Sequence, residues 1–121
     1  MINDNRRFIS KPWGWEEHIC GLGKKLFIKK GFGTSWHRNE KKNKVILVDK
    51  GELIVYHGAS QLCYDASNHV LKDGDSISIL CREYNRLTSL SDCYITEFFD
   101  YYDIDGLDVT RYDPVTGLEI K

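Results

Sequence analysis

The chain has 121 residues, of which 17 are lysine or arginine and 18 are aspartate or glutamate. This length suffices for one domain with a hydrophobic core, so we expect a single domain over residues 1–121. The net charge of −1 provides no overall field for nucleic acid or an anionic membrane, and we expect neither partner. No apolar run reaches the length that crosses a bilayer, and the start "MINDNRRF" lacks the apolar segment of a secretion signal. We therefore expect a cytoplasmic protein.

Five short segments have the composition of β-strands. They are rich in β-branched and aromatic residues, and several alternate apolar with polar side chains. Turn sequences separate them, namely "GFG" at 31–33, "DKGE" at 49–52, "SNH" at 67–69 and "KDGD" at 72–75. The predicted strands are 25–30, 44–48, 52–57, 76–80 and 93–99. Strands at this spacing, without long helical segments between them, predict an all-β sandwich or barrel.

The last segment, residues 101–121, mixes charged side chains with aromatic and aliphatic ones. Its sequence "DPVTG" is typical of a turn. We expect this tail to fold back over the barrel, with room for a helical turn near residues 104–109.

The four cysteines, Cys20, Cys63, Cys81 and Cys93, lie far apart in the chain. No pair has the CxxC spacing of a zinc or redox site, and no histidine stands at zinc-finger distance. Their pattern favours reduced thiols that act as small apolar side chains.

Several segments together resemble a known family. They are "KPWGWEE" (11–17), "KKGFGTSWH" (29–37), "DKGELIVY" (49–56), "LKDGDSISI" (71–79) and "ITEFFDYYDIDGLDVTRYDPVTG" (95–117). In the same order they resemble the cupin domain of the type II mannose-6-phosphate isomerases, which is often fused to a mannose-1-phosphate guanylyltransferase. The resemblance covers nearly the whole chain and implies an all-β double-stranded β-helix, a jelly-roll cupin barrel with the C-terminal tail packed on it. We expect only the cupin part to apply, because 121 residues leave no room for a nucleotidyltransferase region.

The resemblance also assigns the positions of the family's metal ligands. When the glycine of the first cupin motif is aligned with Gly51, the three ligands of that motif fall on His37, Asn39 and Lys44. The second motif places the fourth ligand on Asn85. A divalent first-row metal prefers imidazole, carboxylate or thiolate donors, and a protonated lysine repels it. We therefore expect no tightly bound metal, although His37 alone retains a ligand's chemistry.

The residues at the four ligand positions suggest a polar pocket without a metal. Our hypothesis is that the Lys44 ammonium takes the place of the ion, that Asn39 and Asn85 accept hydrogen bonds from it, and that His37 stays neutral beside it. The alternative is that Lys44 turns outward to water. Alternation on a strand puts Lys44 on the same side as Ile46 and Val48, which favour the interior. Both interpretations remain open from the sequence alone.

Further candidates surround this set. Glu97 falls where the family has an acidic residue in its last barrel strand, so it is a candidate for the pocket. Among the other histidines, His57 is the one most suited to join His37 as a second ligand, but a surface or capping role is the more common one.

Aromatic and basic side chains provide a second group of candidates. Trp13, Trp15 and Trp36 are candidates for stacking on a sugar ring, although tryptophans serve more often in packing. Alternation turns Trp36 away from the side of His37. Lys29 and Arg86 are candidate phosphate contacts.

These observations predict a protein that binds a small molecule, a carbohydrate or sugar phosphate, without a tightly bound metal. An alternative is a sugar-phosphate isomerase or epimerase in which His37 is the base and Lys44 stabilises the enediolate. A third interpretation is a non-catalytic scaffold that binds another protein. The aromatic opening "PWGW" and the tail suit a homodimer contact, since cupins commonly pair through their sheets.

Overall fold

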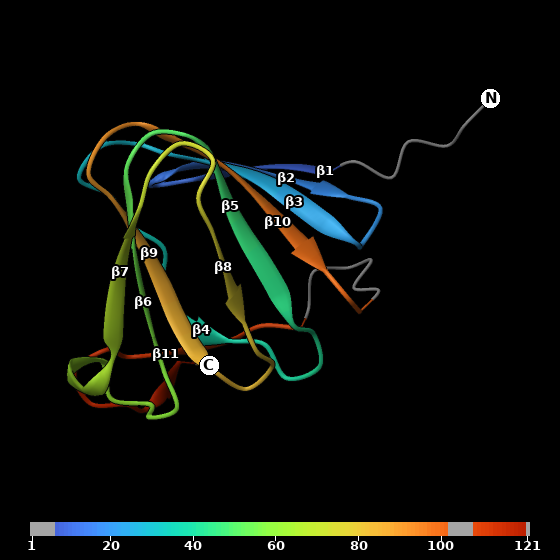
Figure 1. Ribbon diagram of the computed structural model, residues 1–121. Coiled ribbons are helices and arrows are strands. Elements are labelled where there is room, and N and C mark those ends of the chain that lie inside the picture. The colour runs from blue at the N-terminus through green and yellow to red at the C-terminus, as the bar shows by residue number, and fades with distance from the viewer. Residues whose placement is uncertain (1–6, 102–107, 121) are drawn as a thin grey trace.

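The computed structural model describes residues 7–101 and 108–120. Two antiparallel sheets of six strands each face one another (Figure 1). The first sheet has the order β1 (Arg7–Lys11), β2 (Gly14–Ile19), β3 (Gly23–Ile28), β10 (Cys93–Phe99), β5 (Lys44–Lys50) and β8 (Ser76–Ile79). The second has the order β12 (Glu119–Ile120), β11 (Thr110–Tyr112), β4 (Trp36–Arg38), β9 (Tyr84–Ser89), β6 (Leu53–Gly58) and β7 (Ser67–Leu71). A 3-10 helix, η1 (Cys63–Asp65), precedes β7.

The expected all-β jelly roll is confirmed, and each predicted strand corresponds to an observed one. The prediction 93–99 coincides with β10, and the other predicted boundaries differ from the observed ones by at most two residues. Within the described ranges, no helix has the length and apolar character needed to cross a membrane.

Strands whose side chains do not alternate in hydropathy are absent from the predicted set. The turn predicted at residues 67–69 is wrong, because β7 begins at Ser67. As an edge strand, β7 exposes all of its side chains except Leu71, so it carries no apolar period. The strand β9 was missed because Asn85 occupies an interior position where an aliphatic residue is usual.

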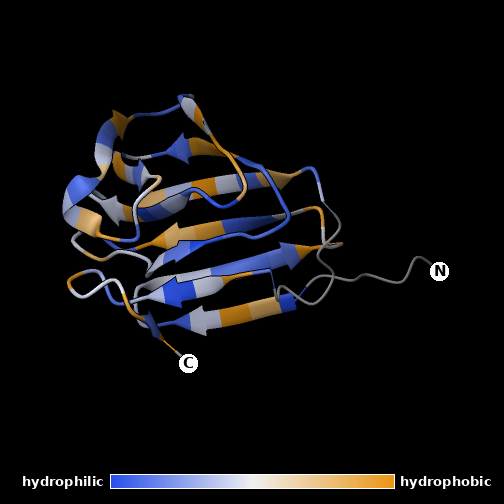
Figure 2. Ribbon diagram, turned by 90° about the horizontal axis from the view of Figure 1, so that it is seen from below, coloured by the Kyte–Doolittle hydropathy of each residue, from blue (hydrophilic) through white to orange (hydrophobic). Residues whose placement is uncertain are grey.

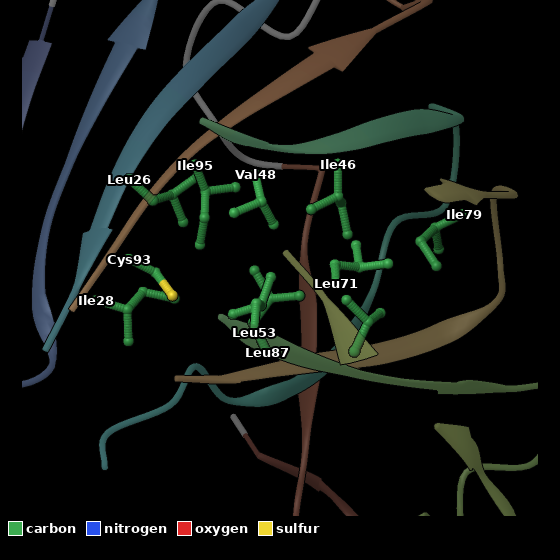
Figure 3. Close-up of a cluster of buried hydrophobic side chains, with 11 residues drawn as sticks. Leu26, Ile28, Ile46, Val48, Leu53, Leu71, Ile79, Leu87, Cys93 and Ile95 are labelled. Atoms are coloured by element: carbon green, nitrogen blue, oxygen red, sulfur yellow. The ribbon is translucent and has the colours of Figure 1, made fainter. Parts of the chain in front are cut away.

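The hydrophobic core lies between the two sheets. Hydrophobic and hydrophilic residues alternate along the strands (Figure 2), so one side of each sheet is apolar. Figure 3 shows the core side chains pointing toward one another from both sheets. The core is formed by Leu26, Ile28, Ile46, Val48, Leu53, Val55, Leu71, Ile79, Leu87, Cys93 and Ile95. Because these residues fill one end of the space between the sheets, the polar side chains that share the interior gather at the other end.

A second apolar cluster secures the tail to the outer side of the second sheet. Trp36, Tyr84 and Tyr112 are buried there, with the ring centroids of Trp36 and Tyr84 separated by 5.9 Å. Strand β11 pairs with β4, so the described part of the tail extends the sheet. The helical turn expected near residues 104–109 falls largely outside the described residues, and Val109 leads directly into β11.

Candidate functional site

A cavity of about 270 Å³ lies at the polar end of the space between the sheets. Inward residues of β2, β3 and β10 form one wall, and residues of β4, β9 and β11 form the other. The lining residues are Lys11, Pro12, Trp13, Glu16, His18, Lys24, Leu26, Thr34, Ser35, His37, Lys42, Leu87, Glu97, Val109 and Arg111.

His37 projects from β4 into this region and is held in one tautomer. Its Nδ1 donates a hydrogen bond to the Ser35 carbonyl over 2.8 Å, which leaves the Nε2 lone pair facing Lys44 Nζ at 3.3 Å. Burial and, to a smaller extent, the charge of Lys44 together lower the pKa of His37 to about 3. The imidazole is therefore neutral and accepts a hydrogen bond from the lysine.

Lys44 lies inside the barrel, with only 3% of its surface exposed. Alternation along β5 places it on the same side as Ile46 and Val48, as expected. Its Nζ lies 3.5 Å from Glu97 Oε2, which projects inward from the neighbouring strand β10. Burial lowers the pKa of Lys44 to about 8, although the Glu97 carboxylate acts in the opposite direction. At neutral pH the ammonium is thus still charged.

Glu97 is 2% exposed and remains ionised. Burial acts to raise its pKa, but the charges of Lys44 and then Lys24 outweigh burial and lower the pKa below its usual value. Lys24 Nζ lies 3.9 Å from Glu97 Oε1. A buried carboxylate therefore bridges the deep lysine of β5 and the lysine of β3 that faces the cavity.

Asn39 and Asn85 are buried, but their hydrogen bonds differ from those expected. Asn39 Nδ2 donates to the Asp108 carbonyl over 2.5 Å, and Asn85 Nδ2 donates to the carbonyls of Glu83 and His37. Both side chains thus act as donors that fix the backbone around β4. The expectation that they accept hydrogen bonds from Lys44 is corrected by this geometry, in which Glu97 and His37 take that role.

The metal that the fold family implies does not fit this donor set. In a metal site, the Nε2 lone pair of His37 would be the ligand, but the Lys44 ammonium faces it at 3.3 Å. Within residues 7–101 and 108–120, no group of three or more His, Cys, Asp or Glu side chains is placed to hold a metal ion. The fixed ammonium carries the positive charge at this position, and it repels a second cation.

A second ionic cluster stands at the cavity wall on β2 and β3. Glu16 Oε1 lies 2.8 Å from His18 Nε2, and Glu16 Oε2 lies 3.4 Å from Lys24 Nζ. Burial acts to raise the pKa of Glu16, but the hydrogen bond from His18 and the charge of Lys24 outweigh it and lower the pKa to about 2. Lys11 approaches the same carboxylate at 3.9 Å.

Among the described residues that line the cavity, positive charges outnumber negative ones. Four lysine and arginine side chains line it, Lys11, Lys24, Lys42 and Arg111, against the two carboxylates Glu16 and Glu97. Because His37 is neutral, it does not change this balance. A low-dielectric cleft with this excess attracts anions.

The tryptophans have three different positions. Trp13 lines the cavity beside Pro12. Trp15 lies on the outer side of the first sheet, where its ring centroid is 6.1 Å from that of Phe27. Trp36 is in the apolar cluster on the outer side of the second sheet, opposite to His37 as expected. Of the three, only Trp13 is placed to contact a cavity ligand.

Three other candidates lie away from the cavity. Lys29 Nζ sits 5.5 Å from the ring centroid of Phe32, and Arg86 projects from β9 beside Tyr56, so neither expected phosphate contact lines the cavity. His57 Nδ1 lies 2.6 Å from Glu83 Oε2. This side-chain contact agrees with the structural role favoured for His57.

Three charged residues of the cavity were not predicted from the sequence, namely Glu16, Lys24 and Arg111. Glu16 and Lys24 are inward positions of strands whose polar side chains resemble those of a solvated edge strand. The available signal was the "WEEH" sequence, in which Glu16 and His18 share one side of the strand. Arg111 reaches the cavity only because β11 pairs with β4, a contact distant in sequence.

The C-terminal tail also binds the loop that connects β4 to β5. The Asp108 carboxylate accepts hydrogen bonds from the backbone N–H groups of Glu40, Lys41 and Lys42 at 3.0 to 3.2 Å. This loop connects β4 to β5, so Asp108 fixes the spacing of the two strands that carry His37 and Lys44.

Comparison with known proteins identifies the fold. No family model matches the chain, and no curated protein matches its sequence. Among solved structures, the capsular polysaccharide assembling protein CapF from Staphylococcus aureus has a TM-score of 0.70 and 14% identity, over 86% of this chain and 31% of CapF. The Drosophila melanogaster CENP-C cupin domain has a TM-score of 0.67 and 14% identity, over 78% of this chain and 75% of that domain.

A structure of oxalate oxidase is also similar, with a TM-score of 0.62 and 17% identity over 74% of this chain and 45% of that protein. These proteins have the cupin fold, and at such identities the likeness shows the fold alone. The present chain accordingly has the cupin fold, and it spans only about a third of CapF. An oxalate oxidase and the CENP-C cupin domain share this architecture, so the fold does not select an activity.

Proposed function

We propose that the protein binds a small anionic carbohydrate, such as a sugar phosphate, in the cavity between its sheets and does so without a bound metal. The observation that carries this proposal is the excess of lysine and arginine over carboxylate side chains among the described residues that line a cavity of about 270 Å³. The remaining wall combines Trp13 and Pro12 with polar groups, a composition that suits the mixed apolar and hydroxylated surface of a sugar.

The positive charge of the cavity would attract the anionic group of such a ligand. Glu16 pairs with Lys24, and Glu97 pairs with Lys44. These two carboxylates therefore neutralise only part of the positive charge around the cavity. Arg111 adds a planar guanidinium at the wall formed by β11, and such a group binds a phosphate or carboxylate through two parallel hydrogen bonds. The lysines supply point charges around it.

Binding is favoured over the isomerase alternative by the protonation state of the candidate base. An isomerase needs a base whose pKa is close to the working pH. Burial holds the pKa of His37 near 3, so the imidazole is a weak proton acceptor at neutral pH. Lys44, the candidate electrophile, is covered by His37 and Glu97 and does not line the cavity.

Calorimetric titration with matched ligands tests the proposal. Mannose 6-phosphate, mannose and inorganic phosphate separate the contribution of the sugar from that of the anion. We expect the sugar phosphate to bind more tightly than either fragment, and its affinity to fall as salt is added. An Arg111→Gln variant should weaken its binding about tenfold, since a charge-assisted hydrogen bond is lost.

The matched control is Lys72→Gln, because Lys72 is an exposed lysine outside the cavity. Its affinity for the sugar phosphate should equal that of the wild type. Equal affinity of the Arg111→Gln variant and the wild type, or tighter binding of mannose than of its phosphate, contradicts the proposal. Incubation of the complex followed by analysis of the sugar tests isomerisation, and we expect the aldose to be recovered unchanged.

A further inference from the structure

Glu97 has one carboxylate oxygen that the protein itself does not bind. Its Oε2 faces Lys44 Nζ at 3.5 Å, whereas its Oε1 is buried and has no hydrogen-bond partner among the described residues. Such atoms are rare, because an unpaired polar atom in the interior has lost its hydration without compensation. In the part of the chain that the structure describes, Glu97 is the one residue that has such an atom and also lines the cavity. A partner for this oxygen can therefore come from a ligand in the cavity.

Lys24 stands beside the same oxygen and also lines the cavity. Its Nζ lies 3.9 Å from Glu97 Oε1, a distance that is too long for a hydrogen bond. It lies closer to Glu16 Oε2, at 3.4 Å. Because an ammonium group has three N–H donors, the contact with Glu16 leaves further donors of Lys24 for a ligand.

A single hydroxyl group can bridge Lys24 and Glu97. An oxygen atom about 2.8 Å from each of two atoms, the usual length of hydrogen bonds to charged groups, forms a triangle with them. The separation of 3.9 Å between Lys24 Nζ and Glu97 Oε1 fits the third side of such a triangle. In this position the hydroxyl donates to the carboxylate and accepts from the ammonium, since a hydroxyl has both a donor and acceptor lone pairs.

The chemistry of the pair selects a hydroxyl over other polar groups. Two lysine ammonium groups within 4 Å keep the Glu97 carboxylate ionised, so it only accepts, and Lys24 only donates. A carbonyl or ether oxygen of a ligand would satisfy Lys24 but not Glu97. A ligand ammonium would satisfy Glu97 but would be repelled by Lys24 and Lys44. A neutral group that both donates and accepts matches both partners.

Side-chain exposure places this pair at the buried end of the cavity. The exposed fraction is 2% for Glu97 and 14% for Lys24, and it rises to 26% for Lys11. Arg111, on the opposite wall, is exposed. A ligand whose anionic group binds Arg111 at the open side therefore directs its other end toward Glu97 and Lys24.

We propose that Glu97 is the specificity-determining residue of the cavity, because together with Lys24 it binds one hydroxyl group of the sugar on the side remote from the phosphate. This inference rests on the function proposed above and names the feature of the ligand that the protein recognises. An anion without this hydroxyl would leave the Glu97 oxygen unpaired, and a site built to bind a hydroxyl rejects such a compound.

Calorimetric titration of the wild type with mannose 6-phosphate and its 2-deoxy, 3-deoxy and 4-deoxy analogues tests the inference. The hydroxyls on C2 and C3 lie across the ring from the phosphate group, whereas the hydroxyl on C4 lies next to it. Loss of the hydroxyl on C2 or C3 should raise the dissociation constant about 30-fold, the scale of a hydrogen bond to a charged group. Loss of the hydroxyl on C4 should raise it about twofold or less.

Variants assign this discrimination to Glu97. In Glu97→Gln, the ratio of the two dissociation constants, for the discriminated deoxy analogue and for mannose 6-phosphate, should fall to about threefold. The matched control is Glu16→Gln, which removes the same charge from the cavity wall. Both oxygens of Glu16 already have protein partners, His18 and Lys24, so this variant should keep the ratio of about 30-fold.

A second variant keeps the test decisive if Glu97→Gln does not fold, which circular dichroism shows. The double variant Lys44→Met, Glu97→Met removes the carboxylate together with its buried charge partner, and it should also reduce the ratio to about threefold.

The outcomes separate this inference from the proposed function. If mannose 6-phosphate and its three deoxy analogues bind the wild type equally well, the inference fails and the proposed function stands. If none of the four compounds binds, both fail. A loss of affinity confined to the 4-deoxy analogue, or a ratio of about 30-fold that persists in a folded variant without the Glu97 carboxylate, also overturns the inference, because another group would then recognise the sugar.

Discussion

The ammonium of Lys44 lies 3.5 Å from the carboxylate of Glu97 in the interior of the barrel, where both side chains are almost completely buried. A buried ion pair is expensive to desolvate, and it is stable only when each charge keeps its partner. Here His37 accepts from the lysine on a second side. We therefore expect a substitution that removes one of these two charges to lower the free energy of unfolding strongly.

Lys44→Met should destabilise the protein by about 3 kcal/mol at neutral pH, because it leaves the Glu97 carboxylate buried beside an apolar chain. Urea unfolding followed by circular dichroism measures this change. The double variant Lys44→Met, Glu97→Met removes both charges and should recover most of the lost stability. If the double variant is less stable than Lys44→Met, the two charges do not act as a pair.

Stability should depend on pH through His37. The pKa of His37 is about 3 when folded and near 6.5 when unfolded, so the unfolded chain binds the extra proton first as the pH falls. The stabilising contribution is complete above pH 6.5 and is lost toward the folded pKa, at about 1.4 kcal/mol per pH unit. Between pH 6.5 and 5, the free energy of unfolding of the wild type should fall relative to that of His37→Gln, with a slope that approaches this value. Parallel curves for the two proteins contradict the buried neutral imidazole.

Asp108 should stabilise the loop between β4 and β5 through the N–H groups it binds. Asp108→Asn removes the charge that strengthens these hydrogen bonds, and we expect a loss of about 1 to 2 kcal/mol. Hydrogen exchange at the amides of Lys41 and Lys42 should accelerate in the variant. Exchange that remains as slow as in the wild type shows that the tail does not hold the loop.

Gly51, the glycine on which the cupin motif was aligned, should not tolerate a side chain. Its φ is +114°, a conformation that disfavours residues with a Cβ, and an added Cβ would lie 2.5 Å from the Asp92 carbonyl oxygen. Gly51→Ala should cost about 2 to 3 kcal/mol, measured by thermal unfolding. Gly74 also has a positive φ of 85°, but nothing lies near its Cβ position, so Gly74→Ala should cost less.

The sequence predicted the elements whose side chains follow a simple period. Alternation alone set Lys44 beside Ile46 and Val48, and the structure places all three inside. The motif alignment led to Asn85, which is buried but is not among the residues that line the cavity, and the alignment could not give its hydrogen bonds. These depend on the pairing of β9 with β4, and two strands that far apart in the chain leave no local signal of their contact.

Charged residues of the cavity were harder to predict for a related reason. An inward Glu16 or Lys24 has the same local pattern as an outward one, and only the pairing of β2 with β3 shows that they share a wall. Sequence reasoning assigned phosphate contacts to Arg86 and Lys29 on residue type alone. Whether a side chain reaches the cavity depends on the side of the sheet on which it lies. The sequence did not fix this side for either residue.

Lys44 stands at a position that the cupin motif assigns to a metal ligand, and its ammonium lies 3.3 Å from His37 Nε2 in the barrel interior. Elemental analysis of protein purified without a metal-affinity tag, and then exposed to excess iron, manganese, zinc and nickel before desalting, tests most directly the claim that this arrangement excludes a metal ion. We predict far less than one equivalent of each metal per chain, in the wild type as purified and after exposure. A near-stoichiometric metal that disappears in the His37→Gln variant would contradict the claim, because it would mean that a cation displaces Lys44 from His37.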